Sequence, residues 1–250
     1  MKVVGVIPAR YASTRFPGKP LVPLFGKPMV IWVSEIAAKA LGRENIYVAT
    51  DDKRIFDTAT KYDFKSIMTP DNVLTGTDRI WEASKTIDAD MYINIQGDEP
   101  MVLPQDIKDV LEAKKIYRDE VVTGMCQIQK DEDPHNVNLP KVITTEDGRM
   151  IYMSRLAIPG TKSLEKKPIT YWREVCIHAY NKKELKLFGE FGRKSYLERF
   201  EDIEILRFLE VNVPVRMIKI ASSSKAVDTP EDVLIVEKHL KELQPADPIQ

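Results

Sequence analysis

The sequence predicts an α/β protein with a mostly parallel sheet, and two observations lead to this prediction. In the first half of the chain, short apolar runs alternate with segments whose apolar residues recur at three- and four-residue spacing. This alternation is typical of βαβ units, in which helices cover both faces of the sheet. The 250 residues, 43% hydrophobic and 30% charged, can bury a sizeable core, which excludes a disordered polymer.

Each predicted element follows from a local pattern. Val3 to Ile7 is a β-branched run that Pro8 closes, as expected of a buried strand. Thr229-Pro230 starts the last helix, because threonine caps and proline takes the first helical position. The expected strands are 3–7, 46–49, 67–68, 91–95, 121–128 and 141–145; the expected helices are 29–40, 53–62, 78–86, 105–116, 182–188, 196–209 and 230–243.

Charge and composition exclude several classes of protein. With 37 basic and 38 acidic residues, the net charge of −1 argues against nucleic-acid partners and against a polybasic membrane anchor. No apolar run approaches the ~20 residues of a membrane span, and the first one is too short for a signal peptide. Cys126 and Cys176 are too few for a disulfide framework. We therefore expect a cytoplasmic protein.

The segment after the first strand is the most informative. Three of the first five cations of the chain, Arg10, Arg15 and Lys19, fall in one loop before any acid occurs. Together with Ser13 and the flexible Gly18, they could bind a polyphosphate. The same cluster also fits a solvated basic turn. It is neither a Walker P-loop nor a G-x-G-x-x-G fingerprint, so the common NTPase and dehydrogenase interpretations lack their marker.

Two acidic positions complement this loop. Asp98 follows the strand that ends at Ile95, and Asp228 directly precedes the last helix. Mg²⁺ prefers one or two carboxylates plus phosphate oxygens, so these acids could hold a metal ion beside a triphosphate. Asp98 also fits an ordinary turn and Asp228 a helix cap. At the junction of residues 75–79, the glycine could approach a nucleotide, whereas Asp78 and Arg79 also fit a surface pair.

In order along the chain, these segments resemble the CMP-Kdo synthetases, or 3-deoxy-manno-octulosonate cytidylyltransferases, which are sugar-activating nucleotidyltransferases. The resemblance spans nearly the whole chain, and its long first motif with the Gln-Gly-Asp-Glu-Pro segment is specific. The matching segments are residues 7–21 (IPARYASTRFPGKPL), 26–29 (GKPM), 48–52 (VATDD), 75–79 (TGTDR), 94–100 (NIQGDEP), 152–155 (YMSR) with 158–159 (IP), and 227–232 (VDTPED).

The resemblance implies a single nucleotidyltransferase domain over residues 1–250. Its sheet would be Rossmann-like and mostly parallel, and a smaller α+β sub-lobe over about 125–180 would bind the sugar and form a homodimer. CMP would pass from CTP to the anomeric hydroxyl of a Kdo-like sugar acid, with Mg²⁺ as cofactor and pyrophosphate released. The implied nucleotide-binding residues are Pro8, Ala9, Arg10, Ser13, Arg15, Lys19, Gly76 and Thr77; Asp98 and Asp228 would hold the metal ion, and both would act in catalysis with Arg10 and Lys19.

The sugar pocket departs from the family pattern. Glu174 replaces the usual His, His178 a Tyr and Ile205 a Gln, and the resemblance adds Gln96 and Glu204 to this sugar-binding set. A relocated polar group in a specificity pocket can change substrate preference by orders of magnitude.

We therefore expect a Kdo-like acceptor, with an 8-amino or sialic-type sugar acid as the alternative, because Glu174 would suit an amino group. Glu174 also fits a salt-bridge partner of Arg173 or Lys166, and His178 a satisfied buried imidazole. The altered pocket also motivates a rival of another class, a catalytically silent nucleotide-binding regulator. Keeping both acids and all three loop cations argues against that rival, because a sensor has less need of a metal-bridged phosphate.

Overall fold

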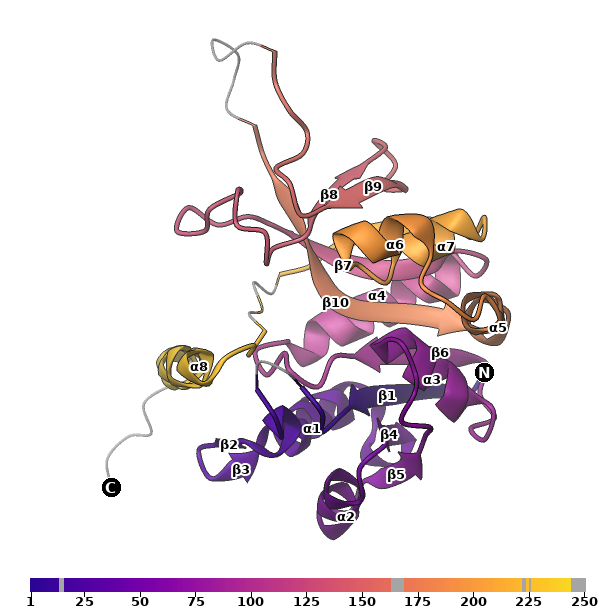
Figure 1. The fold of residues 1–250 in the computed structure, drawn as a ribbon, viewed down its shortest axis with the longest axis vertical. Coiled ribbons are helices and arrows are strands. Elements are labelled where there is room, and N and C mark those ends of the chain that lie inside the picture. Colours follow the sequence, from indigo (N-terminus) through magenta and orange to yellow (C-terminus); the bar gives the residue numbers. More distant parts are fainter. Residues whose placement is uncertain (14–15, 163–168, 222–223, 225, 244–250) are drawn as a thin grey trace.

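A nine-stranded sheet forms the centre of the computed structural model (Figure 1). The structure describes residues 1–13, 16–162, 169–221, 224 and 226–243. Within these ranges, no helix has both the length and the apolarity that crossing a bilayer requires.

Seven strands follow one another in the order β11-β7-β10-β6-β1-β4-β5, and β8 and β9 extend the sheet from β10. Neighbours among β6, β1, β4 and β5 are parallel, as are β11 and β7, whereas β10 is antiparallel to both β6 and β7. The mostly parallel sheet predicted from the sequence is therefore confirmed. Its strands are β1 (Val3–Ala9), β4 (Ile46–Thr50), β5 (Lys65–Met68), β6 (Met91–Ile95), β7 (Val121–Gln127), β8 (Lys141–Thr144), β9 (Met150–Ser154), β10 (Trp172–Asn181) and β11 (Val215–Lys219).

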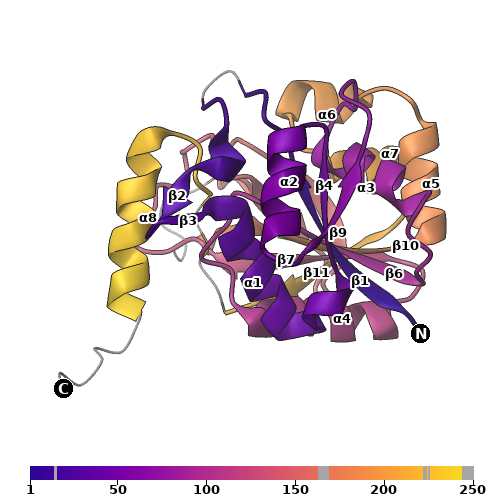
Figure 2. The same cartoon turned by 90° about the horizontal axis from the view of Figure 1, so that it is seen from below.

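Helices cover both faces of the sheet (Figure 2). Val4 and Val6 of β1 face the core beneath α3, α5 and α7, whereas Ile7 and Ala9 face the core beneath α1, α2 and α4. This alternation buries both faces, as the continuous apolar run of β1 requires. The helices are α1 (Met29–Leu41), α2 (Lys53–Lys61), α3 (Gly76–Ser84), α4 (Pro104–Ile116), α5 (Lys182–Glu190), α6 (Tyr196–Glu201), α7 (Leu206–Glu210) and α8 (Pro230–Leu243).

The last helix packs apart from the sheet, against a small hairpin of β2 (Pro23–Leu24) and β3 (Lys27–Pro28) (Figures 1 and 2). Val236 of α8 shares a buried cluster with Leu24, Met29 and Val227. The amide of Thr229 donates to the Asp232 carboxylate, which satisfies a free donor at the start of the helix. The carboxyl-terminal segment is thereby held close to the loop that follows β1.

The structure corrects two parts of the predicted element order. The expected helix 196–209 is two helices, because Asp202 adopts a left-handed conformation (φ 52°) that ends α6. Strands β9, β10 and β11 are not predicted by the sequence pattern. Strand β10 lies in the middle of the sheet but carries Arg173, Glu174 and His178, and buried polar side chains hide the apolar pattern of a central strand.

The predicted sub-lobe over about 125–180 shares strands β7 and β10 with the main sheet. Within this segment, β8 and β9 form an antiparallel pair that projects from β10 (Figure 1). The basic composition of residues 160–170 predicts a loop, and this segment lies partly outside the described residues, which omit 163–168.

Candidate active site

The turns that follow β1 and β6 meet at one edge of the sheet. These strands are parallel neighbours, so their carboxyl ends share that edge, where open α/β sheets bind ligands. A Cβ atom on Gly97 would lie 3.2 Å from the carbonyl oxygen of Pro8. Glycine therefore lets the turn after β6 approach the end of β1, and Asp98 follows directly at this contact.

Lys19 joins the two predicted metal-binding acids. Its Nζ lies 2.6 Å from Oδ2 of Asp98 and 3.4 Å from Oδ1 of Asp228, although 209 residues separate Lys19 from Asp228. The three side chains keep 17%, 29% and 33% of their surface exposed, so the cluster is half-buried and open to a ligand. The structure thus brings these three predicted residues together.

Backbone contacts hold the members of this cluster in place. Gly18, with a φ of 72°, donates its amide to the carbonyl of Tyr11 at 2.9 Å and closes the basic loop just before Lys19. The amide of Val227 donates to the carbonyl of Asp98 at 2.8 Å, which places Asp228 beside Asp98. Because Asp232 accepts the free amides at the start of α8, the carboxylate of Asp228 is left to face Lys19.

The other predicted nucleotide-binding residues surround the same strand end. Pro8 and Ala9 are the buried last residues of β1, and Ser13 Oγ accepts the amide of Phe16 at 3.2 Å. Arg10, directly after β1, is exposed. Burial is the main cause that lowers the pKa of Arg79, and the charge of Arg10 lowers it further. Arg15 lies outside the described residues.

The amino terminus of α3 is occupied by a carboxylate. Glu204 accepts the amide of Gly76 at 3.2 Å and that of Thr77 at 2.7 Å, in the favourable place for a negative charge at a helix start. A Cβ atom on Gly76 would lie 3.3 Å from Nε2 of Gln96 and 3.3 Å from Glu204. Four of the predicted site residues therefore meet here, two from the nucleotide set and two from the sugar set.

A buried arginine that the sequence analysis did not assign supports this arrangement. Arg207 is fully buried and bonds to both oxygens of Glu198, at 2.6 and 2.7 Å, and to both oxygens of Asp78, at 2.7 and 3.1 Å. It thereby ties α7 to α6 and α3, which holds Glu204 at the start of α3. The interpretation of Asp78 and Arg79 as a surface pair is wrong, because both are buried and Arg79 pairs with Asp51 at 3.1 Å.

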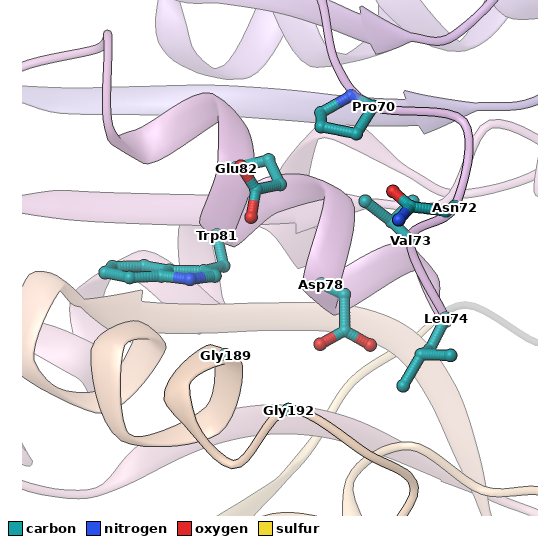
Figure 3. Close-up of a pocket in the computed structure, with 9 residues that line it drawn as sticks. All are labelled: Pro70, Asn72, Val73, Leu74, Asp78, Trp81, Glu82, Gly189 and Gly192. Carbon is teal, nitrogen blue, oxygen red and sulfur yellow. The ribbon is translucent and has the colours of Figure 1, made fainter.

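The far side of α3 packs too closely against α5 to belong to the site. A Cβ atom on Gly189 would lie 1.9 Å from Cδ1 of Trp81, so only glycine fits there. Figure 3 shows the small pocket at this contact, with Trp81 lying over Gly189. None of the residues around it belongs to the Lys19 cluster.

The divergent sugar-pocket residues are buried on β10. Burial raises the pKa of Glu174 to about 8, and the charges of Glu204 and Glu99 contribute to this shift. Burial also lowers the pKa of His178 to about 3, and its Nδ1 lies 2.5 Å from the hydroxyl of Thr123. Ile205 is 2% exposed and belongs to the hydrophobic core, and its contact with a sugar stays a prediction.

Glu174 does not pair with its neighbour Arg173. Successive residues of a strand point to opposite faces, and Arg173 reaches Glu132 at 3.2 Å instead. Lys166, the other predicted partner, lies outside the described residues. Glu174 therefore keeps its carboxyl group on the face that α3 and α7 cover.

A family model identifies the class of protein that this fold and site define. The model described as cytidylyltransferase matches residues 4–220, and the chain belongs to that family. The nucleotidyltransferase activity and the α/β fold predicted from the sequence are both confirmed.

Similar proteins indicate which group of cytidylyltransferases the chain resembles. A 3-deoxy-manno-octulosonate cytidylyltransferase of Escherichia coli is 35% identical over 92% of this chain and 92% of its own length. An 8-amino-3,8-dideoxy-manno-octulosonate cytidylyltransferase of Shewanella pealeana is 38% identical over 96% of this chain and 99% of its own. A solved CMP:2-keto-3-deoxy-manno-octonic acid synthetase complexed with CTP superposes with a TM-score of 0.89 and 34% identity, covering 98% of this chain and 100% of that one. The resemblance to the CMP-Kdo synthetases is confirmed.

Proposed function

We propose that this chain transfers CMP from CTP to the anomeric hydroxyl of a Kdo-like sugar acid, with Mg²⁺ as cofactor and pyrophosphate as the second product. The observation that carries the proposal is the meeting of Lys19, Asp98 and Asp228 at the edge where β1 and β6 end. A synthetase of very similar fold has been solved with CTP, which supports the nucleotide. The named acceptors of the relatives support the sugar acid.

The donor set fits a magnesium ion. Asp98 and Asp228 both reach one ammonium nitrogen, so their carboxylates converge on a point that a cation can occupy. Two carboxylates with phosphate oxygens and water are the ligands that Mg²⁺ prefers. When bound, the ion would neutralise phosphate charge and polarise a phosphoryl oxygen.

The chain's own residues would act by positioning and by charge. Lys19, held beside both acids, is placed to stabilise negative charge that develops on the departing pyrophosphate, and Arg10 would assist from the end of β1. Glu204 and Gln96 would orient the acceptor beside Gly76. Phosphoryl transfer depends chiefly on such positioning, so no covalent nucleophile is required.

A specific observation favours a second acceptor. One relative acts by name on an 8-amino-3,8-dideoxy sugar acid, and Glu174 places a buried carboxyl group where the resemblance puts the sugar. An ammonium group on the acceptor would pair with that carboxylate. The alternative substrate is therefore the 8-amino analogue of Kdo.

Pyrophosphate release tests the proposal. The purified chain is supplied with CTP, Mg²⁺ and in turn Kdo, its 8-amino analogue or a sialic-type acid, with CTP alone as the control. Release above the control with either octulosonate supports the proposal, and the faster one identifies the acceptor. Tight CTP binding without release for any acceptor would instead indicate a silent regulator.

The same proposal includes a homodimer formed through residues 125–180. Three large apolar side chains of this segment are well exposed, Val137 and Ile151 at 54% and Leu156 at 70%. Exposed apolar groups on one segment are typical of an interface between copies. Analytical ultracentrifugation tests this, and a monomer at every concentration would contradict it.

We further propose that the protein acts in the cytoplasm and that its product serves lipopolysaccharide or capsule synthesis.

A further inference from the structure

Three potential metal ligands converge on β10. One carboxylate oxygen of Glu174, the sulfur of Cys176 and one ring nitrogen of His178 all lie within 4.8 Å of one another. Glu174 and His178 are 8% and 4% exposed, and Cys176 is half-buried. The convergence joins hard, soft and borderline donors, a combination that a solvated acidic patch does not offer.

A bulge in the strand explains how these residues meet. In a regular strand, residues 174 and 178 would stand about 13 Å apart, because each residue adds about 3.3 Å. Here the pairing of β10 with β7 shifts register between Val175 and His178, whose partners Gly124 and Thr123 are adjacent. Bulges of this kind re-aim side chains and are common beside active sites.

Among the described residues, the charges that act on Glu174 are mostly negative, with Glu204 and Glu99 opposed by Arg155. Glu99 is 5% exposed, its Oε2 has no hydrogen-bond partner, and its charge is among the causes that raise the pKa of Cys176 after burial itself. The nearby cation Arg173 is paired with Glu132. Several buried acidic groups therefore face one thiol, and a divalent cation would satisfy them together.

One ring nitrogen of His178 has a hydrogen-bond partner on the neighbouring strand. Nδ1 of His178 lies 2.5 Å from the Thr123 hydroxyl, which leaves Nε2 as the ring nitrogen that can bind a metal ion. Metal-binding histidines commonly use the second nitrogen in such a hydrogen bond, which fixes the ring.

We propose that Glu174, Cys176 and His178 form a mononuclear site for a divalent transition-metal ion, Zn²⁺, with a fourth position left for a ligand. Three protein ligands of these types with one open position are typical of zinc sites that bind a substrate group. The thiol and any protonated carboxyl group lose their protons to solvent as the ion binds. Because the resemblance places Glu174 and His178 at the sugar, the open position would take an oxygen or nitrogen donor of the acceptor; this last step rests on the proposed function.

Cobalt binding by the whole chain tests the site without any turnover. The protein is stripped with a chelator and titrated with Co²⁺ in excess Mg²⁺, which saturates oxygen-ligand sites. A stoichiometric thiolate-to-cobalt charge-transfer band that Zn²⁺ abolishes is the expected result. No such band in the unmutated chain would overturn the proposal.

Matched variants assign the ligands. Cys176→Ala should abolish the band, whereas Cys126→Ala, which changes the other cysteine, should keep it. His178→Ala should weaken Co²⁺ binding at least about 100-fold relative to the exposed control His135→Ala, and Thr123→Val should weaken it about 10- to 100-fold by releasing the ring. Circular dichroism verifies that each variant is folded. Equal binding by Cys176→Ala and Cys126→Ala would refute the site.

The two proposals fail separately. A chain that releases pyrophosphate with an octulosonate but never shows the cobalt band overturns the zinc site and leaves the proposed function standing. A chain that shows the band but transfers no CMP to any acceptor supports the site and overturns the proposed function.

Discussion

Two clusters of charged side chains at the same sheet differ in how their charges are balanced. Around Lys19, opposite charges pair while a sixth to a third of each side chain stays exposed. Around Glu174, like charges are buried together, and burial above all raises the pKa of Glu99, Glu174 and Glu204. In the first cluster, a bound nucleotide with its metal ion would give Lys19 and the two acids new partners of opposite charge. The second is costly to bury unless protons or a bound cation neutralise it.

This difference corresponds to two parts of the site, one for the nucleotide that the family shares and one for the acceptor. The Lys19 cluster consists of residues that match the family motifs, and it meets a triphosphate that all such enzymes share. The Glu174 cluster contains two of the three departures from the family pattern. A buried polar pocket discriminates strongly between acceptors because a mismatched group leaves a buried partner unsatisfied.

The largest expected effect is on the free energy of unfolding, and it concerns the buried Arg207, which holds Glu204 at the start of α3. Arg207→Met removes the cation between Glu198 and Asp78, both of which it contacts through two bonds, so two buried carboxylates lose their partner. We expect the free energy of unfolding to fall by about 3–5 kcal/mol. Urea denaturation measures this. The exposed Arg199→Met serves as the control and should change stability by less than about 0.5 kcal/mol; equal effects would contradict the role of Arg207.

The next largest effect is on turnover, and it concerns the two acids of the Lys19 cluster. Asp98→Asn and Asp228→Asn should each lower kcat at least about 100-fold, because each loses a charge that holds the metal ion and phosphates. Stability should change little, since both side chains are partly exposed. Steady-state pyrophosphate release checks this against Asp88→Asn, whose side chain is 95% exposed. Full activity of both variants would remove the metal assignment.

A smaller effect should distinguish acceptors. Glu174→His combined with His178→Tyr and Ile205→Gln restores the family pattern in the pocket. We expect kcat/KM for plain Kdo to rise about tenfold or more, with kcat/KM for CTP unchanged, because only the acceptor half is altered. Competition between Kdo and its 8-amino analogue measures the change. An unaltered preference would mean that these departures do not set specificity.

The smallest effect is a pH dependence of stability. Burial raises the pKa of the Cys126 thiol to about 11 from its ordinary 9.0, so the folded chain keeps a proton that the unfolded chain loses above pH 9. Unfolding then releases a proton, and the free energy of unfolding falls as pH rises, by about 1 kcal/mol between pH 9 and pH 10. Cys126→Ala should lack this part of the slope in urea denaturation at pH 8, 9 and 10. Parallel curves for both proteins would contradict it.

Local sequence patterns are enough to predict the parts of the protein in which such a pattern repeats. The alternation of apolar runs and helical segments predicted the parallel sheet, and β1, β4, β6 and the helices α1, α2 and α4 follow it closely. The same is true of the basic loop and the two acids, since the end of a parallel strand predicts where Lys19 and Asp98 lie. These features are local because side-chain period and turn chemistry act over a few residues.

The remaining features depend on contacts between distant parts of the chain, which outweigh local preference there. Strand β10 is central despite its polar residues, since Arg173 and His178 find buried partners in other parts of the chain, Glu132 and Thr123. Asp202 divides a segment that looked like one helix, and Arg207 becomes the centre of a buried network through Asp78, 129 residues away. The bulge that gathers Glu174, Cys176 and His178 comes from strand register, which depends on β7 rather than on β10 alone.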